Sequence, residues 1–162
     1  MMEELCEYPV QTNNDELRKQ IKFYAIELLS RREHSRGELI TKIAKKFPDN
    51  TNSGLVIGIL DELELAGYQS DERFIEAFVN SRISRGQGPL RITQELRHRG
   101  LDSDIITDWV DAKNTQWYEL ARQTRERKFG LEDPETPKDK NKQLRFLQYR
   151  GFTPEQVFKA LS

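Results

Sequence analysis

Apolar residues recur at intervals of three and four along most of this chain, and charged or polar residues occupy the positions between them. This spacing predicts amphipathic α-helices, because residues three and four apart share one helical face. Runs of glycine, proline, asparagine, aspartate and serine interrupt the pattern and mark turns. The predicted helices cover residues 15–33, 35–47, 55–66, 70–84, 89–99, 102–110, 117–129, 138–149 and 153–161. The pattern therefore indicates an all-α fold.

The stretch from Ser70 to Leu101 contains two of these helices and the turn that joins them. Gly86 and Gly88 lie in the turn, where glycine ends a helix by adopting positive φ. Pro89 suits the first turn of the following helix, where a missing N–H leaves no hydrogen bond unmade. The stretch is predicted to form a helical hairpin.

Capping residues define several other helix ends. Ser35 and Glu38 have the spacing of a capping box, and so do Thr153 and Gln156. The segment Asp102-Ser103-Asp104 is expected to cap the sixth helix. Gly67 is placed to close the third helix in the left-handed conformation.

The periodicity also predicts which side chains face the core. Outside the hairpin of residues 70–101, the predicted core positions are Ile21, Tyr24, Ala25, Leu28, Leu29, Leu39, Ile40, Ile43, Ala44, Phe47, Val56, Ile59, Leu60, Leu63, Ile105, Ile106, Trp109, Val110, Val157, Phe158 and Leu161.

The chain repeats itself. The segment 96–101 aligns with 147–152, and without gaps this register places Ile106 over Val157, Trp109 over Ala160 and Val110 over Leu161. We interpret the chain as three tandem three-helix repeats. The predicted boundaries are a flexible lead-in over 1–15 and repeats over 16–68, 69–112 and 113–162.

Composition agrees with a modular protein. Hydrophobic residues make up 36% of the chain and charged residues 33%, which is lean for one deep core and suits small modules with much surface per residue. We therefore expect the three repeats to form an elongated, curved molecule.

The single cysteine, Cys6, excludes an internal disulfide, and no signal peptide or long apolar run is present. These features favour the cytoplasm, with Cys6 as a free thiol near a frayed terminus.

Residues suited to catalysis or metal binding are scarce. His34, His98 and Cys6 have no ligand spacing for zinc. The Gly86-x-Gly88 pair follows a helix and lacks a third glycine, so it indicates a turn and not a dinucleotide loop. We expect no enzyme activity, no metal and no cofactor.

The distribution of charge is uneven, although the net charge is only −1. Residues 1–80 carry 10 Lys and Arg against 15 Asp and Glu, and residues 81–162 carry 16 against 12. Single arginines on a helix often do no more than cover apolar neighbours, but a cluster favours an anionic partner. The candidate partner- or DNA-binding residues are Arg82, Arg85, Arg91, Arg97, Arg99, Arg122, Arg125, Arg127, Lys128, Lys142, Arg145 and Arg150.

The preceding region is acidic, through Glu62, Glu64, Asp71, Glu72 and Glu76. A surface that carries both signs suits a protein or nucleoprotein partner, with the acids free to meet partner cations. The alternative is a direct DNA-binding protein built from helix-turn-helix-like modules, because three-helix modules with a basic second helix are similar to such readers.

Several segments together resemble the RecX family of regulatory proteins, which modulate the RecA recombinase. They are residues 28–39, 67–74, 81–82, 86–89, 92–100, 121–122, 127–130 and 145–152. The resemblance extends from about Ile21 to the C-terminus.

This resemblance implies a small all-helical protein, without catalytic activity, that binds RecA and its filament on single-stranded DNA. The protein would lie in the filament groove and restrain ATP hydrolysis, strand exchange and co-protease activity, by blocking extension or by promoting disassembly. It would act as a monomer, with at most weak direct DNA binding and no membrane association.

Overall fold

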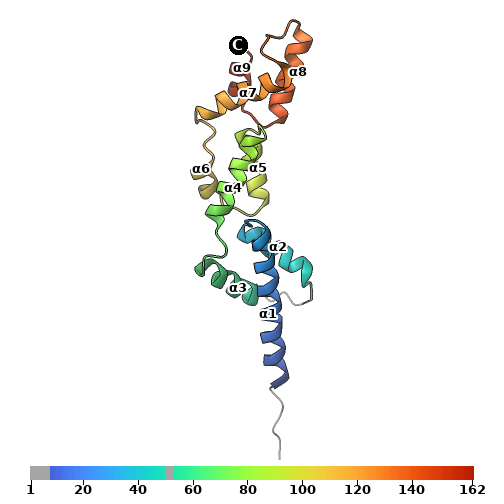
Figure 1. The fold of residues 1–162 in the computed structure, drawn as a ribbon, viewed down its shortest axis with the longest axis vertical. Helices are drawn as coiled ribbons and strands as arrows, with labels where there is room; N and C mark the ends of the chain where they lie inside the picture. The colour runs from blue at the N-terminus through green and yellow to red at the C-terminus, as the bar shows by residue number, and fades with distance from the viewer. Residues whose placement is uncertain (1–7, 50–52) are drawn as a thin grey trace, which may run out of the picture. The chain divides into compact units, whose positions relative to one another are not determined.

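The computed structural model describes residues 8–49 and 53–162, and all regular secondary structure within them is helical (Figure 1). The helices are α1 (Tyr8–Arg31), α2 (Arg36–Lys46), α3 (Ser53–Leu65), α4 (Asp71–Ser84), α5 (Pro89–His98), α6 (Ser103–Trp109), α7 (Gln116–Phe129), α8 (Pro137–Tyr149) and α9 (Pro154–Ala160). The prediction of an all-α fold is confirmed.

The first helix begins earlier than predicted. Helix α1 starts at Tyr8, well before residue 15, so the assignment of 8–14 to a lead-in without structure was wrong. Pro9 does not prevent this start, because the first turn of a helix has no intrahelical use for its N–H groups. Cys6 lies outside the described residues.

The chain divides into two compact units, residues 1–74 and 75–162. The first unit contains α1, α2 and α3, and the second contains α5 to α9 with most of α4. The repeat boundaries at 68/69 and 112/113 stay a prediction.

The core of the first unit follows the predicted periodicity. Its buried side chains are Ile21, Ala25, Leu28, Leu39, Ile43, Val56, Ile59, Leu60 and Leu63. The prediction that Ile40 and Ala44 face the core was wrong, because both side chains are exposed. In α2 the positions that reach the core are Leu39 and Ile43, one turn apart, and the residue after each points to solvent.

The helix ends confirm most of the predicted caps. The Ser35 hydroxyl accepts a hydrogen bond from the Glu38 N–H at 3.0 Å. Both halves of the capping box between Thr153 and Gln156 are present. Gly67 has φ of 82° past the end of α3. Asp102 stands at the N-cap of α6, but its side chain makes no capping hydrogen bond there.

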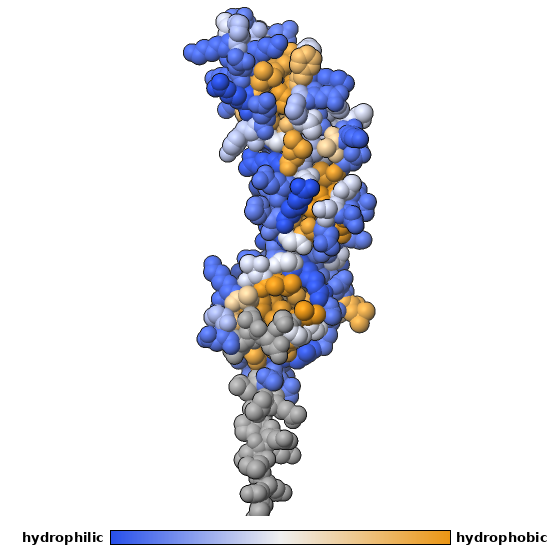
Figure 2. Space-filling model, turned by 180° about the vertical axis from the view of Figure 1, so that it is seen from behind, coloured by the Kyte–Doolittle hydropathy of each residue, from blue (hydrophilic) through white to orange (hydrophobic). Residues whose placement is uncertain are grey.

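The second unit buries apolar side chains in both of its repeats. In the third repeat, Ala121, Leu147, Phe152, Val157 and Ala160 form one cluster, and α7 packs against both α8 and α9. Some apolar residues of this unit also reach the surface, where hydrophilic residues border them (Figure 2).

Two predicted core aromatics of the second unit are exposed. Trp109 is 38% exposed and Phe158 is 67% exposed. Both lie on helices of seven residues, of which α6 buries one side chain and α9 buries three. In α9, Gln156 is fully buried and donates a hydrogen bond to the Ala112 carbonyl at 2.8 Å.

The second and third repeats are joined through main-chain atoms, at what we call the glycine junction. The Gly88 N–H donates to the Arg150 carbonyl at 2.8 Å, and the Leu90 N–H donates to the Gly151 carbonyl at 2.9 Å. A Cβ atom on Gly88 would lie 2.5 Å from the Gly151 carbonyl carbon. A Cβ on Gly151 would lie 2.3 Å from the Arg91 Cβ. Only glycine permits this approach.

Candidate partner-binding surface

The twelve candidate basic residues all lie in the second unit, and they fall into four groups. The first group is exposed, and in the described part of the chain its side chains have no hydrogen bond or ion pair. It comprises Arg85, Arg97, Arg127, Lys128, Lys142 and Arg145. We call these the free cations, because their charges are available to an anionic partner.

Two arginines of the hairpin share one carboxylate. Arg82 donates to Glu95 at 2.8 Å, and Arg91 donates to the other oxygen of Glu95 at 3.3 Å. The Arg82 guanidinium also lies 4.2 Å from the Phe78 ring centroid, and its side chain is only 15% exposed. Arg82 therefore stabilises the hairpin more than it serves a partner.

The ionisation of Glu95 reflects these two arginines. Burial alone would raise the pKa of Glu95, but its hydrogen bonds and charge interactions with Arg82 and Arg91 outweigh burial and lower the pKa below its ordinary value of 4.5. A carboxyl whose pKa falls on folding contributes stability above its unfolded pKa and loses that contribution as the pH falls through the folded value.

We therefore predict a pH-dependent effect of Glu95→Gln. The variant should be less stable than the parent protein near neutral pH, and the difference should shrink once the pH falls below about 4.5. Urea unfolding measured from neutral pH down to about 3 checks this. A difference that stays constant over that range would show that the ion pairs of Glu95 add nothing to stability.

Three further arginines, of which Arg122 is exposed and the other two are half-buried, have partners within the chain. Arg150 donates to the Arg85 carbonyl at 2.8 Å. The Arg99 guanidinium lies 4.9 Å from the Phe78 ring centroid. Arg122 pairs with Glu119 and Glu126, and these carboxylates raise the pKa of Arg122. Their charges are partly used inside the molecule.

The prediction that Arg125 contacts a partner at the surface was wrong. Arg125 is only 4% exposed, and its guanidinium donates to the Gln143 side chain at 2.8 Å and to the Glu132 carbonyl at 2.7 Å. Arg125 thus links α7 to α8 and to the loop before α8. The charge pattern gave no sign of this, because a buried arginine and an exposed one look alike in a sequence.

The predicted free acids are largely engaged as well. Glu62 pairs with Arg18 and Lys22. Glu64 pairs with Arg36, and Asp71 accepts the Arg36 N–H at 2.8 Å. The prediction that these three acids are free to meet a partner was wrong, because they stabilise the first unit.

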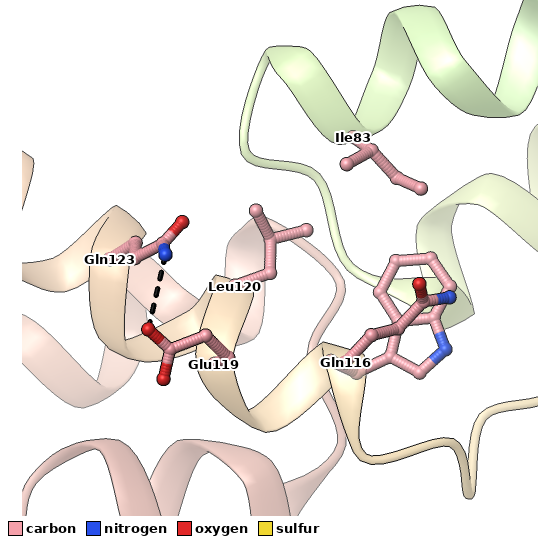
Figure 3. A pocket seen from close by; sticks show the side chains of 6 residues that line it. Ile83, Gln116, Glu119, Leu120 and Gln123 are labelled. Atoms are coloured by element: carbon pink, nitrogen blue, oxygen red, sulfur yellow. Dashed lines mark hydrogen bonds between the residues drawn. The ribbon is translucent and has the colours of Figure 1, made fainter.

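A small cavity of about 220 Å³ lies between α4 and α7 (Figure 3). Ile83, Trp117 and Leu120 line its apolar part, and Glu119 lies on its rim with its carboxylate bonded to Gln123 and Arg122. The lining contains no pair of titratable groups suited to acid–base chemistry.

Among residues 8–49 and 53–162, no three His, Cys, Asp or Glu side chains converge on a possible metal position. None of the described helices is both long enough and apolar enough to cross a membrane.

The sequence interpretation missed an exposed aromatic residue. Tyr149 is 77% exposed at the end of α8, and the Arg91 guanidinium lies 5.4 Å from its ring centroid. The available signal was the spacing of Lys142, Arg145 and Tyr149 by three and four, which places them on one face of a helix.

The fold and this surface define an all-α protein built of three-helix repeats, with cations available on its second unit. Comparison with known proteins places both repeats of the second unit in one family. The profile described as RecX, second three-helix domain, matches residues 70–108, and that of RecX, third three-helix domain, matches residues 114–161.

Comparisons over most of the chain agree. The Regulatory protein RecX of Halorhodospira halophila is 44% identical over 133 residues, which cover 82% of this chain and 81% of the relative. That of Acinetobacter baylyi is 40% identical over 152 residues, which cover 93% and 92%. The crystal structure of RecX from Lactobacillus salivarius has the same fold, with a TM-score of 0.73, 17% identity, and coverage of 88% of this chain and 93% of that one. The chain belongs to the RecX family of regulatory proteins.

Proposed function

We propose that this protein binds the RecA recombinase and its filament on single-stranded DNA, and lowers its ATP hydrolysis, strand exchange and co-protease activity. This proposal rests on membership of the RecX family. The relatives match over more than four fifths of both chains and are named regulatory proteins. The free cations support it, because a nucleoprotein filament is an anionic partner.

The free cations can contribute in a way that the paired arginines cannot. An arginine already bonded to a carboxylate must break that interaction to meet a phosphate, whereas Arg85 or Arg97 need only lose water. Contact with the DNA or with acidic recombinase groups would hold the protein on the filament. A bound protein would then obstruct addition of the next recombinase subunit or loosen the subunits already present.

We also propose that the protein acts by binding and not by catalysis. The relatives are named regulatory proteins. Its activity should therefore depend on the ratio of protein to filament, as a bound inhibitor requires, and a trace amount should have a proportionally small effect.

The central test is recombinase ATP hydrolysis on single-stranded DNA, with RecA from the same organism, measured with and without this protein. We predict that Arg85→Gln with Arg97→Gln raises the concentration for half-inhibition about tenfold, which corresponds to about 1.4 kcal/mol of lost binding. The double variant Arg127→Gln with Lys128→Gln should have a similar effect, because it removes the same charge from the other repeat of the second unit.

The matched control is Lys19→Gln with Lys45→Gln, which removes the same charge from exposed positions of the first unit. This control should inhibit as well as the parent protein. Equal losses in the control and in the second-unit variants would show that only net charge matters. Absence of inhibition by the parent protein in excess over the filament would refute the proposed function.

A direct DNA-binding protein is the second candidate, because the free cations would meet duplex phosphates as readily as a filament. Salt titration separates the two. A protein that works through DNA alone should bind naked DNA tightly and lose affinity steeply with salt. A filament regulator should prefer the recombinase filament over the same DNA without recombinase.

A further inference from the structure

One face of α8 carries a short row of exposed side chains that the helix presents together. Lys142, Arg145 and Tyr149 are spaced by three and four, and all three are exposed. Gln143 and Leu147 are buried on the other side of the helix. The row extends for about 10 Å along the helix axis. We call it the α8 row.

The aromatic end of the row is held from both repeats of the second unit. The Arg91 guanidinium, on α5, lies 5.4 Å from the Tyr149 ring centroid, within the range of a cation–π interaction. Arg91 also bonds to Glu95 at 3.3 Å, and its backbone lies against Gly151 at the glycine junction. Tyr149 is therefore supported by a fixed neighbour while most of its surface is in water.

The electrostatic surroundings of the row favour an anion at its centre. A shallow hollow beside it is lined by Lys138, Asp139, Asn141, Lys142 and Arg145. Asp139 is the only acid in that lining and lies in the first turn of α8. Glu95 is already shared by Arg82 and Arg91. The exposed face of α8 therefore carries a net positive charge between Lys142 and Tyr149.

We propose that the α8 row is a binding site for single-stranded nucleic acid, in which Lys142 and Arg145 contact phosphates and the Tyr149 ring stacks on a base. Exposed aromatic rings beside cations are how proteins hold single strands without reading sequence, because every base has a π-face. A duplex fits poorly, since its base faces are already stacked on one another. An acidic peptide would satisfy the two cations but gives no role to the ring.

This inference deepens the proposed function, on which it rests for its biological setting, because it assigns the α8 row to the DNA strand of the filament and not to the recombinase. It does not need the recombinase for its test. Binding of a single strand to the protein alone is sufficient.

The test is fluorescence anisotropy at low salt with two labelled probes of equal length, an oligothymidine and an abasic strand that keeps the phosphates but lacks the bases. The protein should bind the oligothymidine about fivefold or more tightly than the abasic strand, since one stacked base contributes that much. Tyr149→Ala should remove this difference, and Tyr149→Phe should retain it.

Two further variants complete the test. Lys142→Gln with Arg145→Gln should weaken both probes and flatten the salt dependence, by about 1.4 in the slope of log affinity against log salt. Phe158→Ala is the matched control, because Phe158 is an exposed aromatic of the same unit, at 67% exposure, outside the row. It should bind both probes as the parent protein does.

Equal binding of the two probes by the parent protein, or an unchanged preference in Tyr149→Ala with intact circular dichroism, would overturn the inference. Displacement of the oligothymidine by polyglutamate at equal charge concentration would assign the row to acidic protein instead. If the protein failed to inhibit RecA but still bound the oligothymidine more tightly than the abasic strand, the proposed function would be refuted and the binding site on α8 would stand.

Discussion

Replacing Gly151 with alanine is expected to destabilise the second unit by about 2–5 kcal/mol and to disrupt the glycine junction. Two effects add at this position. Gly151 has φ of 96°, where an L-residue is strained by about 1–2 kcal/mol. The new Cβ would also lie 2.3 Å from the Arg91 Cβ, and such overpacking costs about 1–3 kcal/mol or more.

Two other glycines separate these effects. Gly88 has φ of −87°, so Gly88→Ala adds the clash with Gly151 without backbone strain, and about 1–3 kcal/mol is expected. Gly130 has φ of 89° with open space where a Cβ would stand, so Gly130→Ala adds strain alone, at about 1–2 kcal/mol.

Urea unfolding followed by tryptophan fluorescence measures all three variants. Trp109 and Trp117 are the two tryptophans of the chain and both lie in the second unit, so the signal reports on that unit. If Gly151→Ala is no worse than Gly130→Ala, the repeats can separate at the junction without loss of stability.

Replacing Arg125 with alanine is expected to destabilise the second unit by about 3 kcal/mol. The variant loses two hydrogen bonds from a charged donor and leaves the Gln143 side-chain oxygen buried without its partner. The same fluorescence measurement applies. Nearly all of this loss should appear in stability and little in the affinity of the folded protein for its partner.

Arg125→Lys is the informative control for this prediction. Lysine keeps the charge but lacks the planar fork that lets arginine reach both Gln143 and the Glu132 carbonyl. A structural role predicts that Arg125→Lys is destabilised too. If Arg125→Lys were as stable as the parent while Arg125→Ala lost only inhibition of the recombinase, Arg125 would be a contact residue after all.

The helical periodicity predicted most of the fold, because burial in a three-helix repeat is decided within a few turns. The residues Val56, Ile59, Leu60 and Leu63 are all buried as the spacing requires. The start of α1 was not predictable from periodicity, since residues 8–14 have no regular apolar spacing in the sequence. Trp109 and Phe158 were misplaced because a helix of two turns is too short for the apolar spacing to show which neighbouring positions are buried.

The candidate surface was less predictable than the core. A sequence shows that Arg85 and Arg125 are both arginines, but not that one is exposed and the other buried. That difference depends on Gln143, which is distant in the sequence. The support of Tyr149 by Arg91 likewise depends on contacts between two repeats, which no local pattern encodes.

The glycine junction also bears on how strongly the second unit can bind. Because main-chain hydrogen bonds hold the second and third repeats together, Arg97 on one repeat and Arg145 on the other form two attachment points at a fixed spacing. Once one has engaged a partner, the other is presented at a high effective concentration, with little further entropy to lose. Loosening the junction should therefore weaken binding even when every contact residue is intact.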